Sequence, residues 1–192
     1  HLGPLGYRRY RLEEWCGKRG NWATCATLSQ LSFSLSSMAR IDFHSNIADK
    51  VAYSCRLIRK IMGSPVAELP MRNIVVVGDE AFLNQLDAQL WTFSSTEFLP
   101  HTWVKDDSAI ETPIVFAQDF DDQSLEHLPH GDVLIHAGTK APRSIETLAS
   151  RFPRIVELVS TEEQDRLAGR ERYKQYRDLG HELHNFDQSA SK

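Results

Sequence analysis

Strand-like and helix-like patterns of apolar residues alternate along the chain from Ala39 onward. The run NIVVVGDE, residues 73–80, is continuously apolar and β-branched before it ends in a glycine and two acids. Such a run is typical of a strand that is buried on both faces and leads into a helix. Apolar positions at helical spacing then follow at Phe82, Leu83, Leu86 and Leu90. This segment therefore predicts one strand–helix unit.

The same reasoning predicts the remaining elements. Strands are expected at residues 40–44, 98–104, 113–117, 132–136 and 154–159, and helices from Asn46 to Met62, from 144 to 151 and from 161 to 179. Asn46 is expected to cap its helix, and Thr161 with Gln164 resembles a capping box. Residues 105–132 are acidic and predict a solvated loop around an edge strand.

The alternation predicts the fold class. Strands and helices that alternate at this pace favour an α/β protein, a single three-layer sandwich with a mostly parallel central sheet. Right-handed crossovers between parallel strands place helices on both faces of the sheet, in a Rossmann-like arrangement.

Residues 1–37 differ from the rest of the chain. They are basic, aromatic and serine-rich, and the first methionine is Met38. We interpret 1–37 as a disordered or non-native leader and 38–192 as the α/β domain, with Met38 as the natural start. A targeting leader is the alternative interpretation, because transit peptides are rich in Arg and Ser.

Composition excludes several classes of protein. The formal net charge of −4 disfavours a duplex-binding domain. Three cysteines without a C-x-x-C pair suit a reducing cytoplasm, and no apolar run approaches the length of a membrane span. Cys55 lies on the apolar stripe of its helix and is interpreted as a core residue.

No enzymatic, metal or cofactor site is predicted. The turn at Gly78 lacks the further glycines of a dinucleotide-binding loop, and Asp79 and Glu80 would repel a phosphate there. The acidic run at residues 119–124 lacks the glycine and the glutamate of a calcium loop. The paired histidines are interpreted as surface residues, and no nucleophile motif is present.

The C-terminal helix carries the main functional signal. Arg166, Arg170, Lys174 and Arg177 fall within about 80° of one another around the helix axis, at 100° per residue. Tyr173 and Tyr176 are expected beside them, Gly169 and Gly180 are expected to leave backbone uncovered, and Ala168 and Leu179 are expected to face the core. Such a surface suits a short acidic peptide with an apolar anchor.

Three other interpretations of this helix and of the chain stay open. The cations could form an ordinary solvated face with i, i+4 pairs. They could bind single-stranded nucleic acid, with Tyr173 and Tyr176 as stacking platforms, although the net charge opposes this. The weakest alternative is an enzyme with a degenerate nucleotide site at Gly78.

Two segments carry a family resemblance. RLAGRERYKQYRDLGHEL, residues 166–183, and AQLWTFSSTEFLPH, residues 88–101, resemble the chi subunit of the bacterial DNA polymerase III holoenzyme. The resemblance spans residues 38–192. It implies a non-catalytic clamp-loader accessory in the bacterial cytoplasm, with a nucleotide-binding-like fold but no bound nucleotide. The psi subunit and the acidic C-terminal tail of single-stranded DNA-binding protein are its implied partners, without direct, specific contact to nucleic acid.

The resemblance also implies two sets of site residues. The site for the tail of single-stranded DNA-binding protein would comprise Val159, Arg166, Arg170, Tyr173, Lys174 and Arg177, with Val159 in the apolar pocket. The psi-facing surface would use Trp91 and Phe98.

Overall fold

The computed structural model describes residues 38–63, 72–92, 94, 98–118, 127–140 and 145–190. The prediction of a leader over residues 1–37 lies outside the described residues, as does the acidic run at 119–124.

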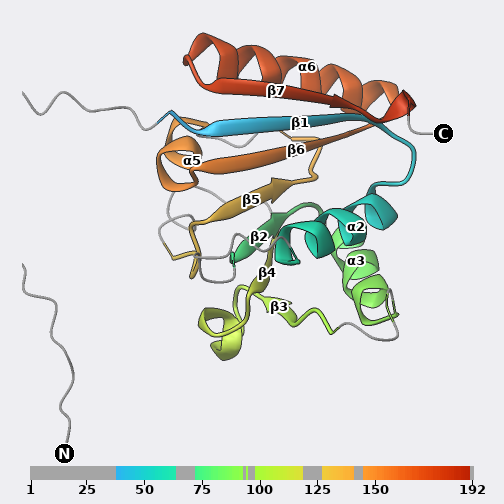
Figure 1. Cartoon of the computed structure of the whole chain (residues 1–192), viewed down its shortest axis with the longest axis vertical. Helices are drawn as coiled ribbons and strands as arrows, with labels where there is room; N and C mark the ends of the chain where they lie inside the picture. Colours follow the sequence, from blue (N-terminus) through green and yellow to red (C-terminus); the bar gives the residue numbers. More distant parts are fainter. Residues whose placement is uncertain are drawn as a thin grey trace, which may run out of the picture. The chain divides into compact units, whose positions relative to one another are not determined.

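A seven-stranded sheet forms the centre of the fold (Figure 1). Its strand order is β3-β4-β2-β5-β6-β1-β7, and each pairing between neighbouring strands is parallel. The strands are β1 (Arg40–Ile47), β2 (Ile74–Val77), β3 (His101–Trp103), β4 (Ile114–Ala117), β5 (Val133–His136), β6 (Arg154–Ser160) and β7 (Glu182–Asp187). The predicted α/β sandwich is confirmed, and its sheet is parallel throughout the described strands.

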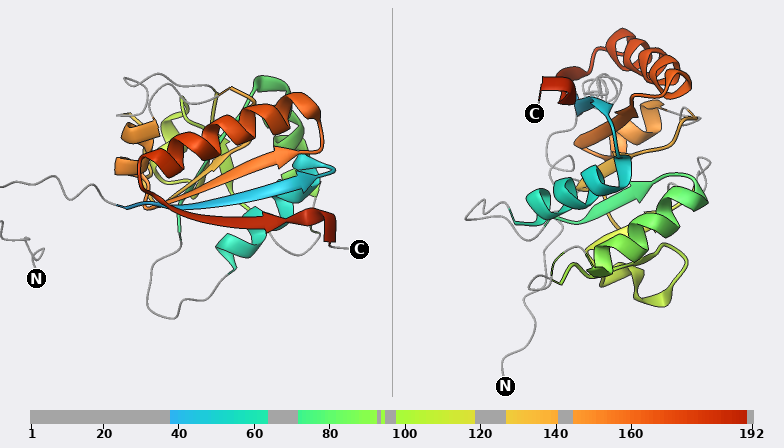
Figure 2. Two further views of the ribbon diagram at one scale, coloured as in Figure 1. Left: turned by 90° about the horizontal axis from the view of Figure 1, so that it is seen from above. Right: turned by 90° about the vertical axis from the view of Figure 1, so that its right-hand side faces the viewer.

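Helices cover both faces of this sheet (Figure 2). They are α2 (Lys50–Met62), α3 (Glu80–Thr92), α5 (Ile145–Arg151) and α6 (Glu163–Asp178), with short 3-10 turns η3 (Asp107–Ile110) and η4 (Gln188–Ala190). Apolar residues of α2 and α3 pack on one face and those of α5 and α6 on the other, which produces two apolar layers. Successive residues of the central strands alternate between these layers, because side chains along a strand point to opposite faces.

The first helix begins later than predicted. Its N-cap is Asp49, whose carboxylate accepts a hydrogen bond from the backbone N–H of Ala52 at 3.0 Å. Asn46 belongs instead to β1, where its φ of 58° places it in the left-handed region that asparagine tolerates. The pattern of apolar residues predicts the position of the helix correctly, but the predicted cap at Asn46 is wrong.

The prediction about one edge strand is wrong, and the strand at the other edge was not predicted. β4 lies between β3 and β2, so the edge strand is β3 and not the strand within residues 105–132. β7 was not predicted at all, and it forms the other edge beside β1.

Candidate functional site

The helix α6 is fixed at its first turn by a buried carboxylate. Asp165 accepts a hydrogen bond from the backbone N–H of Ser160 at 2.7 Å and pairs with Lys50 Nζ at 2.5 Å. Lys50 Nζ also donates to the carbonyl of Ala137 at 2.8 Å. The predicted capping box is wrong, because the N-cap is Glu162 and makes no side-chain cap bond. Asp165 instead ties α6 to the end of β6 and to α2.

The side of α6 that faces the core consists of Asp165, Gly169, Arg172 and Tyr176. This differs from the prediction, since Ala168 is half-buried and Leu179 is exposed. The expectation of uncovered backbone at Gly169 is also wrong, because the helix packs on β6 at this glycine. A Cβ atom at Gly169 would lie 2.8 Å from Val159 Cγ2 and 3.0 Å from Val159 Cγ1. Gly169 therefore allows α6 to lie directly against the sheet.

A buried polar cluster holds the same side of the helix. Glu157 of β6 accepts hydrogen bonds from Arg172 Nε at 2.8 Å and from Tyr176 Oη at 3.0 Å, and it lies 2.9 Å from His136 Nδ1. Arg172 Nη1 also donates to the carbonyl of Thr139 at 3.2 Å. A fully buried guanidinium is thus neutralised inside the protein.

Electrostatics in this cluster favour ionised Glu157. Burial alone would raise the pKa of Glu157, but the charges of His136 and Arg172 and the hydrogen bonds from His136 and Tyr176 outweigh it and lower the pKa to about 2. Burial and the neighbouring Glu157 raise the pKa of Tyr176 well above its usual range. Tyr176 is fully buried, so the interpretation of this ring as a stacking platform for nucleic acid is wrong.

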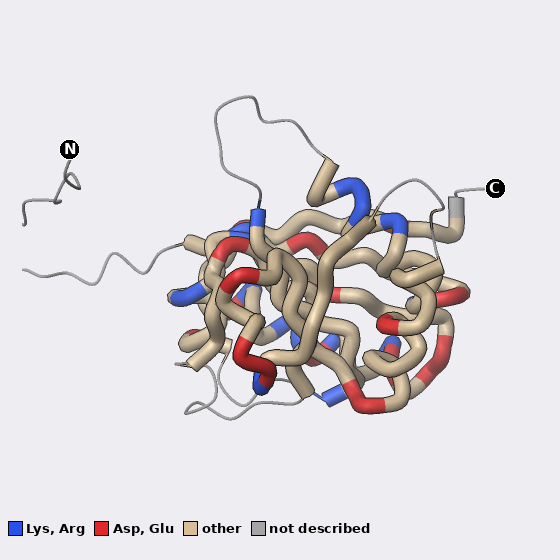
Figure 3. Tube along the Cα trace, turned by 90° about the horizontal axis from the view of Figure 1, so that it is seen from below, with Lys and Arg blue, Asp and Glu red and all other residues tan. Residues whose placement is uncertain are grey.

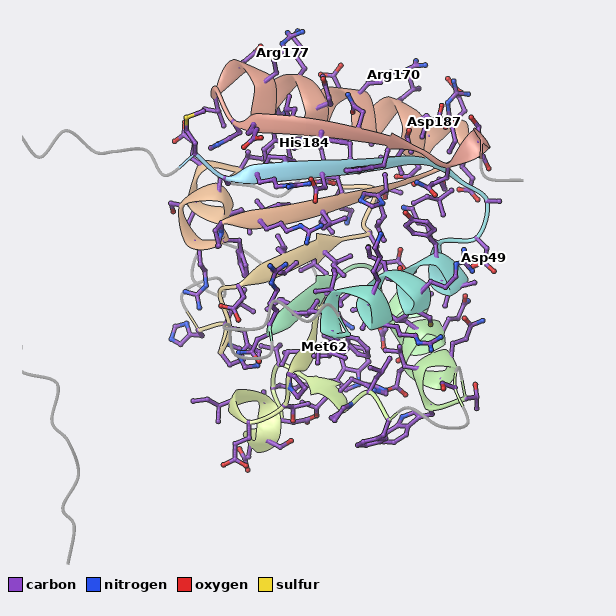
Figure 4. The ribbon with its side chains drawn as sticks, in the orientation of Figure 1. Asp49, Met62, Arg170, Arg177, His184 and Asp187 are labelled. Atoms are coloured by element: carbon purple, nitrogen blue, oxygen red, sulfur yellow. The ribbon has the colours of Figure 1, made fainter. Side chains whose placement is uncertain are left out.

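The predicted cations lie on the outer side of α6. Arg170 and Lys174 are exposed, and neither forms an ion pair with any described residue. Arg166 pairs with Glu163 at 3.0 Å and Arg177 with Asp178 at 3.0 Å, and both pairs are open to solvent. Arg170 and Arg177 project from the helix away from the sheet in Figure 4. We call Arg166, Arg170, Lys174 and Arg177 the cationic stripe.

Exposed ion pairs leave the cationic stripe available to a ligand. Such pairs contribute only ~0.2–1 kcal/mol each, so an incoming carboxylate can replace Glu163 or Asp178 at little cost. Elsewhere in the molecule, basic and acidic segments are interspersed (Figure 3).

Apolar surface borders the cationic stripe. The Tyr173 ring is half-buried against the edge of Phe43, with 5.1 Å between ring centroids, and its hydroxyl accepts a hydrogen bond from Asn185 Nδ2 at 3.4 Å. Leu167 is 51% exposed on the same helix. Sequence reasoning missed Leu167, although its position about 100° from Arg166 places it beside Lys174 on the helix surface.

Trp91 and Phe98 form a second exposed feature. Trp91 lies near the end of α3, Phe98 precedes β3, and their ring centroids are 5.5 Å apart. Trp91 also contacts the ring of His101 at 4.8 Å. The two side chains are 56% and 68% exposed, which is unusual for large apolar groups that already touch each other. The structure thus brings this predicted pair together, near the sheet edge opposite to β7.

Comparison with known proteins assigns the chain to a family. The family model described as DNA polymerase III chi subunit, HolC, matches residues 38–184 of this chain. The chain belongs to the DNA polymerase III chi subunit family. It is similar to the DNA polymerase III subunit chi of Pseudomonas aeruginosa, with 29% identity over 152 residues, an alignment that covers 76% of this chain and 94% of the relative. The predicted family is confirmed.

Membership of the chi family supports an accessory role in DNA replication, within the DNA polymerase III complex. Many doubly wound folds bind a nucleotide at the turn after the strand that corresponds to β2. In this chi-family chain, Asp79 and Phe82 occupy the turn at Gly78. The Asp79 carboxylate accepts a hydrogen bond from the Phe82 backbone N–H at 2.9 Å and so caps α3. The Phe82 ring fills the space beside Gly78, because a Cβ there would lie 2.8 Å from the ring.

The cysteine in α2 of this chi-family chain has a structural role. Cys55 is buried in the core, and burial raises the pKa of its thiol to about 11, which confirms its interpretation as a core residue. Within the described ranges, no cluster of His, Cys, Asp and Glu has the makings of a metal site. None of the described helices combines the length and apolarity that crossing a bilayer requires.

Proposed function

We propose that this chain is a non-catalytic adaptor of the bacterial replisome, in the cytoplasm. In this proposal the cationic stripe, with Tyr173, binds the acidic C-terminal tail of single-stranded DNA-binding protein. Trp91 and Phe98 bind the psi subunit and so connect that tail to the clamp loader. The observation that carries the proposal is the contrast between the two sides of α6, since Arg172 is neutralised internally while Arg170 and Lys174 have no described ion-pair partner.

The chemistry of the cationic stripe suits a carboxylate-rich peptide. Guanidinium groups bind carboxylates through paired hydrogen bonds, which a single ammonium group cannot reproduce. Exposed charges alone give weak binding, so an apolar side chain of the tail must contribute much of the affinity. Leu167 and the open part of the Tyr173 ring offer that contact. Micromolar affinity, about −8 kcal/mol, is expected for such a small contact.

Val159 has a supporting place in this proposal. It is 5% exposed and lies beneath Gly169, where it sets the distance between α6 and β6. Its contribution to peptide binding is therefore to form the floor below the helix and to position the cationic stripe.

The two proposed surfaces lie near opposite edges of the sheet, β7 and β3. Six steps between neighbouring strands, at about 4.8 Å each, separate these edges by about 29 Å. Both partners could then bind at the same time without contact between them, as an adaptor requires.

Replacement of Arg170 tests the proposed tail site. We expect Arg170→Ala to weaken binding of the labelled C-terminal tail peptide of single-stranded DNA-binding protein about 3- to 10-fold, because one charge-assisted contact is lost. Fluorescence anisotropy at increasing salt measures the effect, and the wild-type affinity should fall as salt rises. Lys105→Ala, at an exposed cation near the other sheet edge, is the matched control and should bind like the wild type.

A parallel titration with a single-stranded oligonucleotide and with ATP separates the alternatives. The proposal requires little binding of either at about 0.15 M salt. An oligonucleotide that binds while the tail peptide does not would assign the cationic stripe to nucleic acid instead.

Replacement of Trp91 tests the psi surface. We expect Trp91→Ala to weaken binding to purified psi at least tenfold, since exposed aromatic anchors that become buried dominate interface energies. Isothermal titration calorimetry measures this, with Leu167→Ala as an exposed apolar control on α6. If Trp91→Ala bound psi with unchanged affinity, this surface would not be the psi site. The proposal for the tail site on α6 would still stand.

A further inference from the structure

The outer edge of β7 has no strand beside it in the described sheet, in which β7 pairs with β1 alone. Glu182 lies opposite Arg40, and the Glu182 N–H donates to the carbonyl of Ala39 at 3.2 Å. In a parallel ladder, every second residue bonds to the same neighbour. The N–H and C=O groups of Leu183, Asn185 and Asp187 therefore point away from β1, toward a strand position that no described strand fills.

The cationic stripe follows this edge. The chain reverses between α6 and β7 at Gly180, whose φ of 80° lies in the left-handed region, so the helix and the strand run antiparallel (Figure 1). The 16 residues of α6 and the six of β7 have matching lengths, about 24 Å and about 20 Å. The contact between Tyr173 and Asn185 places the Tyr173 side of the helix over β7. Arg166 and Arg177 flank Tyr173 on the helix surface, so they border the edge.

The two acidic side chains of β7 lie at the ends of the strand, and both form hydrogen bonds within the protein. Glu182 is bound by His184 Nε2 at 2.7 Å. Asp187 accepts hydrogen bonds from Asn46 Nδ2 at 2.8 Å and from the Ser189 N–H at 2.9 Å. Between them, the strand exposes Phe186 at 39%, with its ring packed on His44 on the face opposite to α6. Charge along the edge is thus dominated by the cationic stripe.

We propose that an acidic peptide binds this chain by adding an eighth strand to the sheet, along the outer edge of β7. This inference rests on the proposed function and specifies how the tail would bind. The peptide backbone pairs with Leu183, Asn185 and Asp187. Because side chains alternate along a strand, every second side chain of the peptide faces α6 and offers its carboxylate to Arg170 or its neighbours. The side chains between them face Phe186, where an apolar residue packs.

Backbone methylation of the tail peptide tests this mode of binding directly. In an added strand, only alternate peptide N–H groups bond to β7. We therefore prepare two peptides, each N-methylated at every second residue but in opposite phases, and titrate both against the full chain. One phase should bind at least tenfold more weakly than the other. Equal affinities for the two phases would overturn the added strand.

A variant of the edge provides a second test. Asn185→Pro removes an N–H that points outward, so the ladder to β1 stays intact, whereas Asn185→Ala keeps that N–H and removes only the side chain. Peptide binding should fall at least tenfold in Asn185→Pro and remain within about threefold in Asn185→Ala. Amide hydrogen exchange of the wild type, which needs no variant, should show protection of Leu183, Asn185 and Asp187 when the peptide is added.

The outcomes separate this inference from the proposed function. If Arg170→Ala weakens binding but exchange at the three amides is unchanged, the tail binds the helix alone and the added strand is wrong. If the wild type binds no peptide, both are wrong. A concentration-dependent dimer in sedimentation experiments that Asn185→Pro abolishes would assign the edge to a second copy of this chain, and this also overturns the inference.

Discussion

Replacing Arg172 with methionine should lower the free energy of unfolding by about 3–5 kcal/mol, because it leaves Glu157 as a buried carboxylate without the guanidinium that binds it. Methionine preserves most of the volume of the side chain, so the loss reports charge and hydrogen bonding more than packing. Chemical denaturation at pH 7 measures the effect. Arg170→Met, on the exposed side of the same helix, is the matched control and should stay within about 0.5 kcal/mol of the wild type.

The pH dependence of the same variant identifies the cause. The pKa of Glu157 falls from 4.5 to about 2 on folding, so its contribution to stability is present above pH 4.5 and is lost as the pH falls toward 2. In Arg172→Met, burial still raises the pKa of Glu157, and the charge of Arg172 no longer opposes that effect. The variant should take up a proton at Glu157 on mild acidification, and the stability difference from the wild type should narrow between pH 7 and pH 4.5. A difference that stays constant over this range would mean that lost packing, and not the uncompensated charge, destabilises the variant.

Replacing Gly169 with valine should lower the free energy of unfolding by about 2–3 kcal/mol, since added bulk in a packed core costs about 1–3 kcal/mol. The clash involves the two methyl groups of Val159, a β-branched residue with little freedom to rotate. Valine favours a helix more than glycine does, and this gain of some tenths of a kcal/mol is too small to offset the clash. Thermal and chemical unfolding measure the loss.

A second substitution checks that Val159 is the obstacle. Val159→Ala removes both contacting methyl groups, so the double variant Gly169→Val with Val159→Ala should be more stable than the sum of the two single effects predicts. Gln175→Val, at an exposed position of α6, is the control for valine in this helix and should lie near the wild type. Strict additivity in the double variant would show that valine at position 169 destabilises the protein through some other contact.

Most of the fold was predictable because it depends on apolar periodicity. β2 is four β-branched residues buried on both faces, and such a run has few alternatives. β7 was missed for the opposite reason. Its sequence ELHNFD has no strong period, since one of its edges and much of its surface remain open to solvent. Its place in the sheet depends on pairing with β1, about 140 residues earlier in the chain, and no local pattern encodes that.

The candidate site was predictable for its exposed half only. Helical spacing places Arg166, Arg170, Lys174 and Arg177 on one side of α6, whatever the rest of the chain does. The buried half was not predicted, because Tyr176 was expected beside the cations at the surface and Arg172 was assigned no role. Their burial depends on Glu157, which belongs to a different element, so only the folded chain reveals that one of the four arginines of α6 is internal.

The two ends of the sheet differ in how much mechanical load they can carry. In the proposed function, a replisome in motion would pull the tail and the clamp loader apart, and the tension would cross the sheet from one strand to the next. β1 and β7 are paired over six residue pairs, whereas β3 and β4 are paired over three. Under tension, β3 should detach first, so the proposed connection would break at the end that carries the proposed psi surface.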